Sequence, residues 1–342
     1  MRYPFGLVLD TVKHVAAKKL QGERRFPLML WLDPLGKSSG TCRGNNDACN
    51  GAPMLSVDDC IAAMKECRTP IVSLYGGEPL RYPEIATLTR TILETGRHLF
   101  LCTDGTLIRQ RLHMIPPYTN FFWDVKLDGT QNVHDALANR PGLFAEAIDG
   151  IKAAKNAGFF VVVSSSVCPK TDVGDLVELY DHLHALHVDG YFLLPHYPHQ
   201  KLCRDGNAQF HKQMHAKFRE ASERLGDFNL LISPIYLEYL RGERELDCSV
   251  WAGPVRAPMG WSSPCSFVNS GYANTYKDLL DKTLWENYGR GLNPCCENCQ
   301  CYDGYETSAL LGMNPKAGDL WKLLTWQLSG GLGERRNGAR RI

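Results

Sequence analysis

Between residues 26 and 195 the chain alternates short apolar runs with longer segments of helical periodicity, and this alternation constrains the fold most. The six apolar runs, which we predict to be strands, are residues 27–33, 70–75, 98–103, 121–127, 159–167 and 190–195. The segments predicted to be helices are residues 57–67, 83–95, 107–115, 143–157 and 173–186. Strands that are apolar almost throughout are typical of a parallel sheet covered on both faces. The pattern therefore predicts an α/β fold of six βα units. Six units are too few to close an eight-stranded barrel, so we expect a partial (βα)6 TIM-like barrel with its site at the carboxyl ends of the strands.

Beyond residue 200 the pattern changes. We predict a helix at residues 207–225, a short strand at 230–233, a cysteine-bearing region at 247–304 and an amphipathic helix at 319–328. We interpret these elements as a cysteine-rich C-terminal extension rather than a seventh barrel unit. The predicted division is an N-terminal amphipathic helix (1–25), the barrel (26–200), the extension (201–328) and a flexible basic tail (329–342). In the first helix, Val8, Val12 and Val15 have helical spacing and are expected to pack on the core.

Charge and hydropathy exclude several classes of protein. The chain has 38 basic and 37 acidic residues, so no excess positive field would attract a nucleic acid. No apolar run is long enough to span a membrane, and lysines interrupt the apolar pattern of residues 1–22, which argues against a secretory signal. We expect a cytoplasmic protein with no nucleic-acid partner and with peripheral membrane contact at most.

The chain has 13 cysteines, and their distribution favours metal binding in a reducing compartment over a disulfide framework. Cys60 and Cys67 lie at helical spacing and are expected to face the core. The strongest local metal signal is a group near the C-terminus with a C-x2-C step, which lets two thiolates meet one ion. The candidate ligands there are Cys248, Cys265, Cys295, Cys296, Cys299 and Cys301. An iron–sulfur cluster, a zinc ion and unligated thiols all remain open.

Three successive strands end in polar, glycine-containing turns, which parallel strands bring to one rim. The residues are Gly76, Gly77, Glu78 and Pro79 after the second strand, Thr103 and Asp104 after the third, and Asp128 after the fourth. Convergent polar groups at one rim predict a small-molecule site. The sixth strand is followed by His196, Tyr197 and His199, which we expect to contact substrate by hydrogen bonding or acid–base chemistry.

With these turns the chain resembles the radical S-adenosylmethionine (radical SAM) superfamily and, within it, the adenosylhopane synthase family of hopanoid biosynthesis. The resemblance implies that the rim residues named above bind S-adenosylmethionine (SAM) beside a [4Fe-4S] cluster reduced by an external donor such as flavodoxin or ferredoxin. It implies radical addition or C–C bond formation on an alkene-bearing small molecule, which is a terpenoid in the resembled family. A nucleoside or sugar alkene of a secondary-metabolite pathway is the other substrate class that stays open. It also implies that Cys102 donates a hydrogen atom from its thiol.

The chain departs from the family at the loop after the first strand. The family pattern there is Cys-x3-Cys-x2-Cys, and the matching residues are Ser38, Cys42 and Asn45, with Cys49 following. A cluster with one open iron needs three thiolates. Three hypotheses remain: Cys42 and Cys49 hold an unusual cluster with a further ligand; SAM is bound without a cluster for polar chemistry; or the fold is a scaffold with a structural metal. In the resembled family the C-terminal region reads Cys-x2-Cys-x3-Cys, whose last position is Asp303 here.

Overall fold

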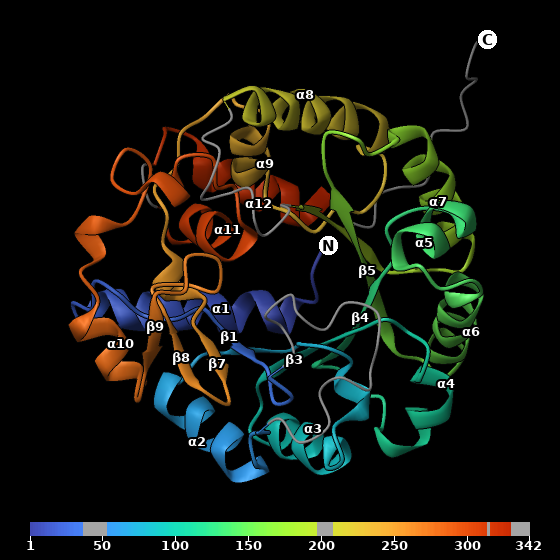
Figure 1. Cartoon of the computed structure of the whole chain (residues 1–342), viewed down its shortest axis with the longest axis horizontal. Coiled ribbons are helices and arrows are strands. Elements are labelled where there is room, and N and C mark those ends of the chain that lie inside the picture. Colours follow the sequence, from blue (N-terminus) through green and yellow to red (C-terminus); the bar gives the residue numbers. More distant parts are fainter. Residues whose placement is uncertain (37–52, 197–207, 313–314, 330–342) are drawn as a thin grey trace.

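The computed structural model describes residues 1–36, 53–196, 208–312 and 315–329. One nine-stranded sheet with the order β6-β5-β4-β3-β2-β1-β7-β8-β9 curves around the molecule, and helices cover its outer face (Figure 1). The strands are β1 (Met29–Leu32), β2 (Ile71–Leu74), β3 (His98–Thr103), β4 (Phe121–Lys126), β5 (Phe160–Val167), β6 (Gly190–Pro195), β7 (Val255–Ala257), β8 (Gly260–Ser263) and β9 (Gly271–Ala273).

Strands β1 to β6 are parallel and adjacent in chain order, as predicted. This part of the sheet is the expected partial (βα)6 barrel, and all six predicted strands are confirmed within two residues at each end. Alternate residues face the outer helices, and Leu99, Leu101 and Trp123 are fully buried there. The intervening positions face the barrel interior, where they include both aromatic and polar side chains.

The barrel helices also follow the sequence pattern. They are α2 (Val57–Cys67), α3 (Ile85–Glu94), α4 (Ile108–Arg111), α5 (Gln131–Ala138), α6 (Leu143–Asn156) and α7 (Val173–Ala185). A capping box between Ser56 and Asp59 begins α2. Cys60 and Cys67 are buried on the inner face of α2, which confirms their predicted place in the core. The predicted helix at 107–115 is broken, because a 3-10 turn (Leu112–Met114) follows the single turn of α4, and α5 was not predicted.

The C-terminal extension joins the barrel sheet, which the sequence did not predict. Strand β7 pairs in parallel with β1 through Trp31 and Val255, and β8 and β9 continue the sheet in antiparallel fashion. The strand predicted at 230–233 is wrong, since Leu230 forms only an isolated bridge with Tyr191. The helices of the extension are α8 (Ala208–Leu225), α9 (Pro234–Leu240), α10 (Tyr276–Lys282), α11 (Tyr302–Leu311) and α12 (Asp319–Ser329). The division of the chain at residue 200 stays a prediction.

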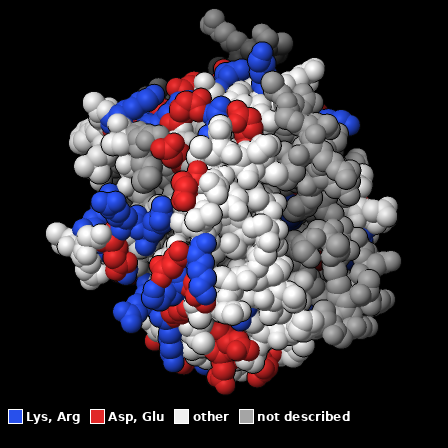
Figure 2. Space-filling model, turned by 60° about the vertical axis from the view of Figure 1, so that its left-hand side comes forward, with Lys and Arg blue, Asp and Glu red and all other residues white. Residues whose placement is uncertain are grey.

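Helix α1 (Phe5–Leu20) lies at the amino ends of the strands, where Asp10 contacts His98 of β3 at 3.0 Å. Its buried position is Leu7, whereas Val12 is 58% exposed. The prediction that Val12 packs on the core is therefore wrong, because the side of α1 carrying Leu7 and His14 faces the barrel. None of the helices within the described residues is long and apolar enough to cross a membrane. On the face shown in Figure 2, side chains of both charges are interspersed beside a broad uncharged area.

Candidate active site and cysteine-lined cavity

The turn after β2 approaches the loop after β1 closely. Gly76 has φ of +89°, and a Cβ built on it would lie 2.1 Å from Oδ1 of the fully buried Asp33. Gly77 also has a positive φ, of +63°. At position 76 only glycine can accept both the left-handed backbone and the contact with Asp33, and the positive φ at position 77 favours glycine there too.

Glu78 fastens the turn after β2 to the end of β3. Its Oε1 accepts a hydrogen bond from the Leu80 amide at 2.9 Å. Its Oε2 accepts from the Thr103 hydroxyl and from the Asp104 amide, both at 2.8 Å. Burial, together with the nearby charge of Asp104, raises the pKa of Glu78 to about 8. The predicted rim residues of β2 and β3 are thus in direct contact, and Glu78 is a buried structural tie between them.

Asp128 belongs to a neighbouring part of the same rim. Its Oδ1 accepts a hydrogen bond from the Ser166 amide at 2.7 Å, and its Oδ2 lies 3.5 Å from Lys126 Nζ. The next residue, Gly129, has no room for a Cβ, which would lie 2.3 Å from Asp175 Oδ2. Asp128 is therefore anchored to the end of β5 rather than to the Glu78 tie.

A polar layer crosses the barrel interior below the rim. Cys102 on β3 and Asp124 on β4 are register partners, and Cys102 Sγ donates to Asp124 Oδ2 at 3.2 Å. The Ser73 hydroxyl of β2 lies 3.4 Å from Cys102 Sγ, and the Ser164 hydroxyl of β5 donates to Asp124 Oδ1 at 2.5 Å. Burial raises the pKa of the Cys102 thiol well above its ordinary value and raises the pKa of Asp124. Both shifts are toward the protonated forms of these groups.

Several predicted site residues lie outside the described part of the chain: Cys42, Cys49, Tyr197 and His199, together with Ser38 and Asn45 of the loop after the first strand. His196 is described and directly follows β6, where its amide donates to the Val167 carbonyl at 2.8 Å.

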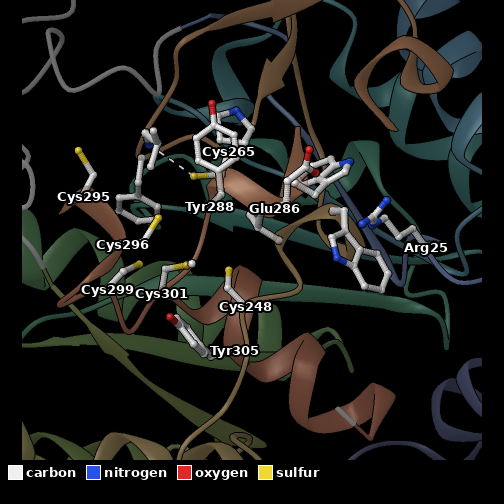
Figure 3. Close-up of a pocket in the computed structure, with 17 residues that line it drawn as sticks. Arg25, Cys248, Cys265, Glu286, Tyr288, Cys295, Cys296, Cys299, Cys301 and Tyr305 are labelled. Atoms are coloured by element: carbon white, nitrogen blue, oxygen red, sulfur yellow. Dashed lines mark hydrogen bonds between the residues drawn. The ribbon is translucent and has the colours of Figure 1, made fainter. Parts of the chain in front are cut away.

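The cysteines of the extension line one cavity of about 230 Å³, which also contacts Arg25, Trp285 and Tyr305. The sulfurs of Cys299, Cys301 and Cys248 follow one another along one side, and Cys265 approaches from the opposite side (Figure 3). Cys295 and Cys296 complete the cavity, so all six predicted cysteines contribute to its wall. Cys295 is disulfide-bonded, so its sulfur is not available to a metal, and the prediction that it is a ligand is wrong.

The polypeptide around these sulfurs is closely fitted to them. A Cβ on Gly304 would lie 2.5 Å from Cys248 Sγ. The Val268 amide donates to Cys265 Sγ at 3.4 Å. Hydroxyls of α9 hold the loop itself, because Tyr239 donates to the Cys299 carbonyl at 2.8 Å and Tyr236 donates to the Gln300 carbonyl at 2.6 Å.

This arrangement suits a soft-metal site in its donor set. Thiolates select zinc or iron–sulfur clusters, and hydrogen bonds to the sulfurs are a feature of cluster sites. Burial raises the pKa of Cys265 to about 12 and that of Cys296 to about 11, so without a metal these thiols are protonated at neutral pH. Within residues 1–36, 53–196, 208–312 and 315–329, no three His, Cys, Asp or Glu side chains are already grouped as a metal site. The thiols would have to turn toward one another to bind one.

Sequence reasoning missed three residues of the site: Asp33, Asp124 and Ser164. Asp124 carries the clearest signal, since it is the one acidic residue in the apolar run 121–127. An acidic side chain at an inward position of a buried strand needs a partner. Asp33 and Ser164 have no comparable signal, because their importance comes from contacts across strands.

The comparisons with known proteins agree with this geometry. Residues 42–183 match the family model described as "Radical SAM superfamily", and residues 192–323 match a domain of unknown function, DUF3463. The curated AdoMet-dependent heme synthase of Methanosarcina barkeri is 24% identical over 271 residues, covering 72% of this chain and 77% of that protein. The finer resemblance to adenosylhopane synthase is not what this comparison finds.

Solved structures show the same fold. SuiB of Streptococcus suis bound to the precursor peptide SuiA has a TM-score of 0.63 and 17% identity, covering 85% of this chain and 75% of that one. SuiB bound to S-adenosylmethionine has a TM-score of 0.56 and 18% identity, covering 72% of this chain and 62% of that one. The family-model match thus covers residues 42–183, and the solved structures share the fold of this chain.

Proposed function

We propose that this protein is a radical SAM enzyme that binds SAM at the rim formed by the turns after β2, β3 and β4. The observation that carries this proposal is the Glu78 tie, which fixes the Gly76–Gly77 turn against Thr103 and Asp104 at the carboxyl ends of adjacent strands. The S-adenosylmethionine bound to the SuiB neighbour supports the same ligand.

Each rim residue has a distinct part in this proposal. The two glycines let backbone atoms approach the methionine end of SAM. Glu78 positions the turn, because its carboxylate already accepts three protein hydrogen bonds. Asp104 and Asp128, from the next two turns, present carboxylates suited to the amine or the ribose hydroxyls of SAM.

The family implies a [4Fe-4S] cluster beside SAM, and we propose that Cys42 and Cys49 are among its ligands. When bound, such a cluster supplies the electron that cleaves the SAM sulfonium and yields a 5′-deoxyadenosyl radical. The third ligand is Ser38 or a cysteine of the C-terminal segment in this proposal.

For the reaction itself we propose radical addition to an alkene-bearing small molecule, a terpenoid or a nucleoside or sugar, with C–C bond formation. Cys102 would complete it by giving the hydrogen atom of its thiol to the substrate carbon radical. Its place in the barrel interior, one strand from Ser73 and Asp124, supports this role. His196, Tyr197 and His199 after β6 are proposed substrate contacts.

We also propose that the cysteine-lined cavity holds a second metal centre, an iron–sulfur cluster or zinc. Cys248, Cys265, Cys296, Cys299 and Cys301 are its proposed ligands. The absence of a Cβ at Gly304 and the amide hydrogen bond to Cys265 support the fit.

Two alternative functions differ in kind from radical addition to an alkene. Formation of heme is favoured by the curated relative, which is named a heme synthase and aligns with 72% of the chain. A protein that binds SAM without cleaving it, for polar chemistry or as a scaffold with a structural metal, is favoured by the missing ligands at Ser38 and Asn45.

Anaerobic purification with iron, sulfide and zinc counting, followed by calorimetric titration with SAM, tests the proposal. We expect SAM binding, and iron and sulfide that fall by one cluster in Cys42→Ala. Unchanged iron content in Cys42→Ala would show that Cys42 is not a cluster ligand. SAM binding without iron would favour the polar or scaffold alternative, and no SAM binding would overturn the proposed function.

A further inference from the structure

Asp124 is a half-buried acidic side chain in direct contact with the thiol proposed as the reactive group of this barrel. It is paired with Cys102 across β3 and β4, with 3.2 Å between Cys102 Sγ and Asp124 Oδ2. Its other oxygen accepts the Ser164 hydroxyl at 2.5 Å. The carboxyl group is therefore held at both oxygens, and one of them is fixed on the thiol.

Among the described residues, no basic side chain forms an ion pair with Asp124. Lys126 lies two positions along β4, but its Nζ contacts Ser166 at 3.1 Å and Asp128 at 3.5 Å. The other titratable groups that act on this pair are Asp303 of α11 and Tyr3 of the N-terminal segment. A carboxylate with little access to water and no cation beside it is costly, and this environment raises the pKa of Asp124.

We propose that Asp124 is the proton partner of Cys102: it keeps the sulfur protonated and returns a proton to it after a hydrogen atom has been given away. This inference rests on the proposed role of Cys102 as hydrogen-atom donor. Asp124 acts through the thiol and is a positioning and proton-supplying residue.

When Cys102 donates a hydrogen atom, its S–H bond breaks, a C–H bond forms on the substrate and a thiyl radical remains. One electron from a reduced flavodoxin or ferredoxin and one proton from the Asp124 carboxylic acid re-form the S–H bond. The Asp124 O–H bond breaks in this step, and the carboxylate then takes up a proton from solvent. The Ser164 hydroxyl stabilises the transient carboxylate.

Infrared difference spectroscopy on the full-length protein, without SAM or substrate, tests the pairing directly. The spectrum of the wild type minus that of Cys102→Ala isolates the S–H stretch of Cys102. In Asp124→Asn we expect this band to shift, and we expect the carbonyl band of a protonated carboxyl group to disappear. Asp149→Asn, which removes an exposed carboxylate on α6 paired with Arg109, is the matched control and should change neither band.

Unshifted S–H absorption in Asp124→Asn, or no protonated carboxyl band assignable to Asp124 at neutral pH, would overturn the proposal. If Asp124→Asn does not fold, Ser164→Ala serves instead, because it removes the donor to Asp124 Oδ1 and leaves both partners in place. The Asp124 carbonyl band should then shift, and an unshifted band would overturn the proposal equally.

A second measurement follows the thiol chemically. The rate at which iodoacetamide alkylates Cys102, read by peptide mass spectrometry across a pH series, reports the thiolate fraction. At the alkaline end of the series, where the Asp124 carboxyl group is ionised, its negative charge opposes formation of the thiolate. Asp124→Asn should therefore raise the alkylation rate there by about tenfold, the change expected for one pKa unit. Asp124→Glu, which keeps a carboxyl group, should restore the slow rate. Equal rates in wild type and Asp124→Asn would contradict the pairing. Since neither measurement uses SAM, failure of this inference is distinguishable from failure of SAM binding or cleavage.

Discussion

Gly304, in the first turn of α11, lies against the sulfur of Cys248, and a Cβ at Gly304 would be 2.5 Å from that sulfur. Cys301 Sγ would lie 3.3 Å from the same Cβ. The start of α11 thus shapes the wall of the cysteine-lined cavity, although Gly304 has no chemistry of its own.

Gly304→Ala should therefore displace Cys248 and lower the metal content of the extension. We expect loss of most of the metal assigned to the cavity while SAM binding at the rim persists. Metal analysis with calorimetric SAM titration checks both. Gly6→Ala in α1 is the control, because its Cβ would meet nothing nearer than 3.9 Å. Full metal content in Gly304→Ala would show that Cys248 is not a ligand.

Gly76→Ala should abolish SAM binding through collision with Asp33. Gly96→Ala is a matched control, because Gly96 also has a positive φ, of +78°, but has nothing within 4 Å of its Cβ position. The control should lose about 1–2 kcal/mol of stability from backbone strain alone. Calorimetric titration should find SAM bound to Gly96→Ala and not to Gly76→Ala, and equal affinity in the two variants would contradict the close approach.

Thr103→Val should weaken the tie between β2 and β3. The Thr103 hydroxyl donates to Glu78 and accepts from the Gly105 amide at 3.0 Å, so its loss leaves the buried Gly105 amide unpaired and removes one of the three hydrogen bonds to Glu78. We expect a loss of about 1–3 kcal/mol in the free energy of unfolding, measured in urea. Thr91→Val removes an exposed helical hydroxyl and should change stability by less than about 0.5 kcal/mol. Equal effects of the two changes would mean that the tie contributes nothing.

Glu306→Gln should change how stability depends on pH. Burial raises the pKa of Glu306 to about 7 in the folded protein, above its ordinary value of 4.5. Its stabilising contribution is therefore fully present below pH 4.5 and is lost as the pH rises through 7. Glutamine can keep both contacts with Ser233, one to the amide at 3.0 Å and one to the hydroxyl at 2.8 Å.

Relative to the wild type, Glu306→Gln should gain on the order of 3 kcal/mol in the free energy of unfolding between pH 4.5 and a pH above 7. Urea unfolding of both proteins at a series of pH values measures this difference. The contributions of the other titrating groups are the same in the two proteins and cancel. A difference that is constant with pH would show that Glu306 is ionised in the folded protein.

The sequence predicted the barrel well because its strands and helices have strong local patterns. Strands β3 and β6 were predicted to the residue, since each is a continuous apolar run bounded by turn residues. The extension was harder, because β7 has only three residues and exists through its pairing with β1, more than 200 residues earlier. No local periodicity encodes such a contact.

The rim and the cysteine group were predictable for a related reason. Glycines that follow predicted strands, and cysteines that lie close together in the chain, can be recognised from the sequence alone. The pairing of Cys102 with Asp124 was not foreseen, because a contact between strands depends on register, which separate strand patterns do not fix. Val12 shows a similar limit for α1: it is exposed, although Val15 of the same predicted face packs on the core.

The central claim is tested most directly by measuring 5′-deoxyadenosine released from SAM by the anaerobically reconstituted protein with dithionite, using liquid chromatography and mass spectrometry. The account predicts release proportional to protein concentration in the wild type and none in Cys42→Ala. Absence of 5′-deoxyadenosine from wild-type protein that binds both iron and SAM, or equal release by Cys42→Ala, would contradict it.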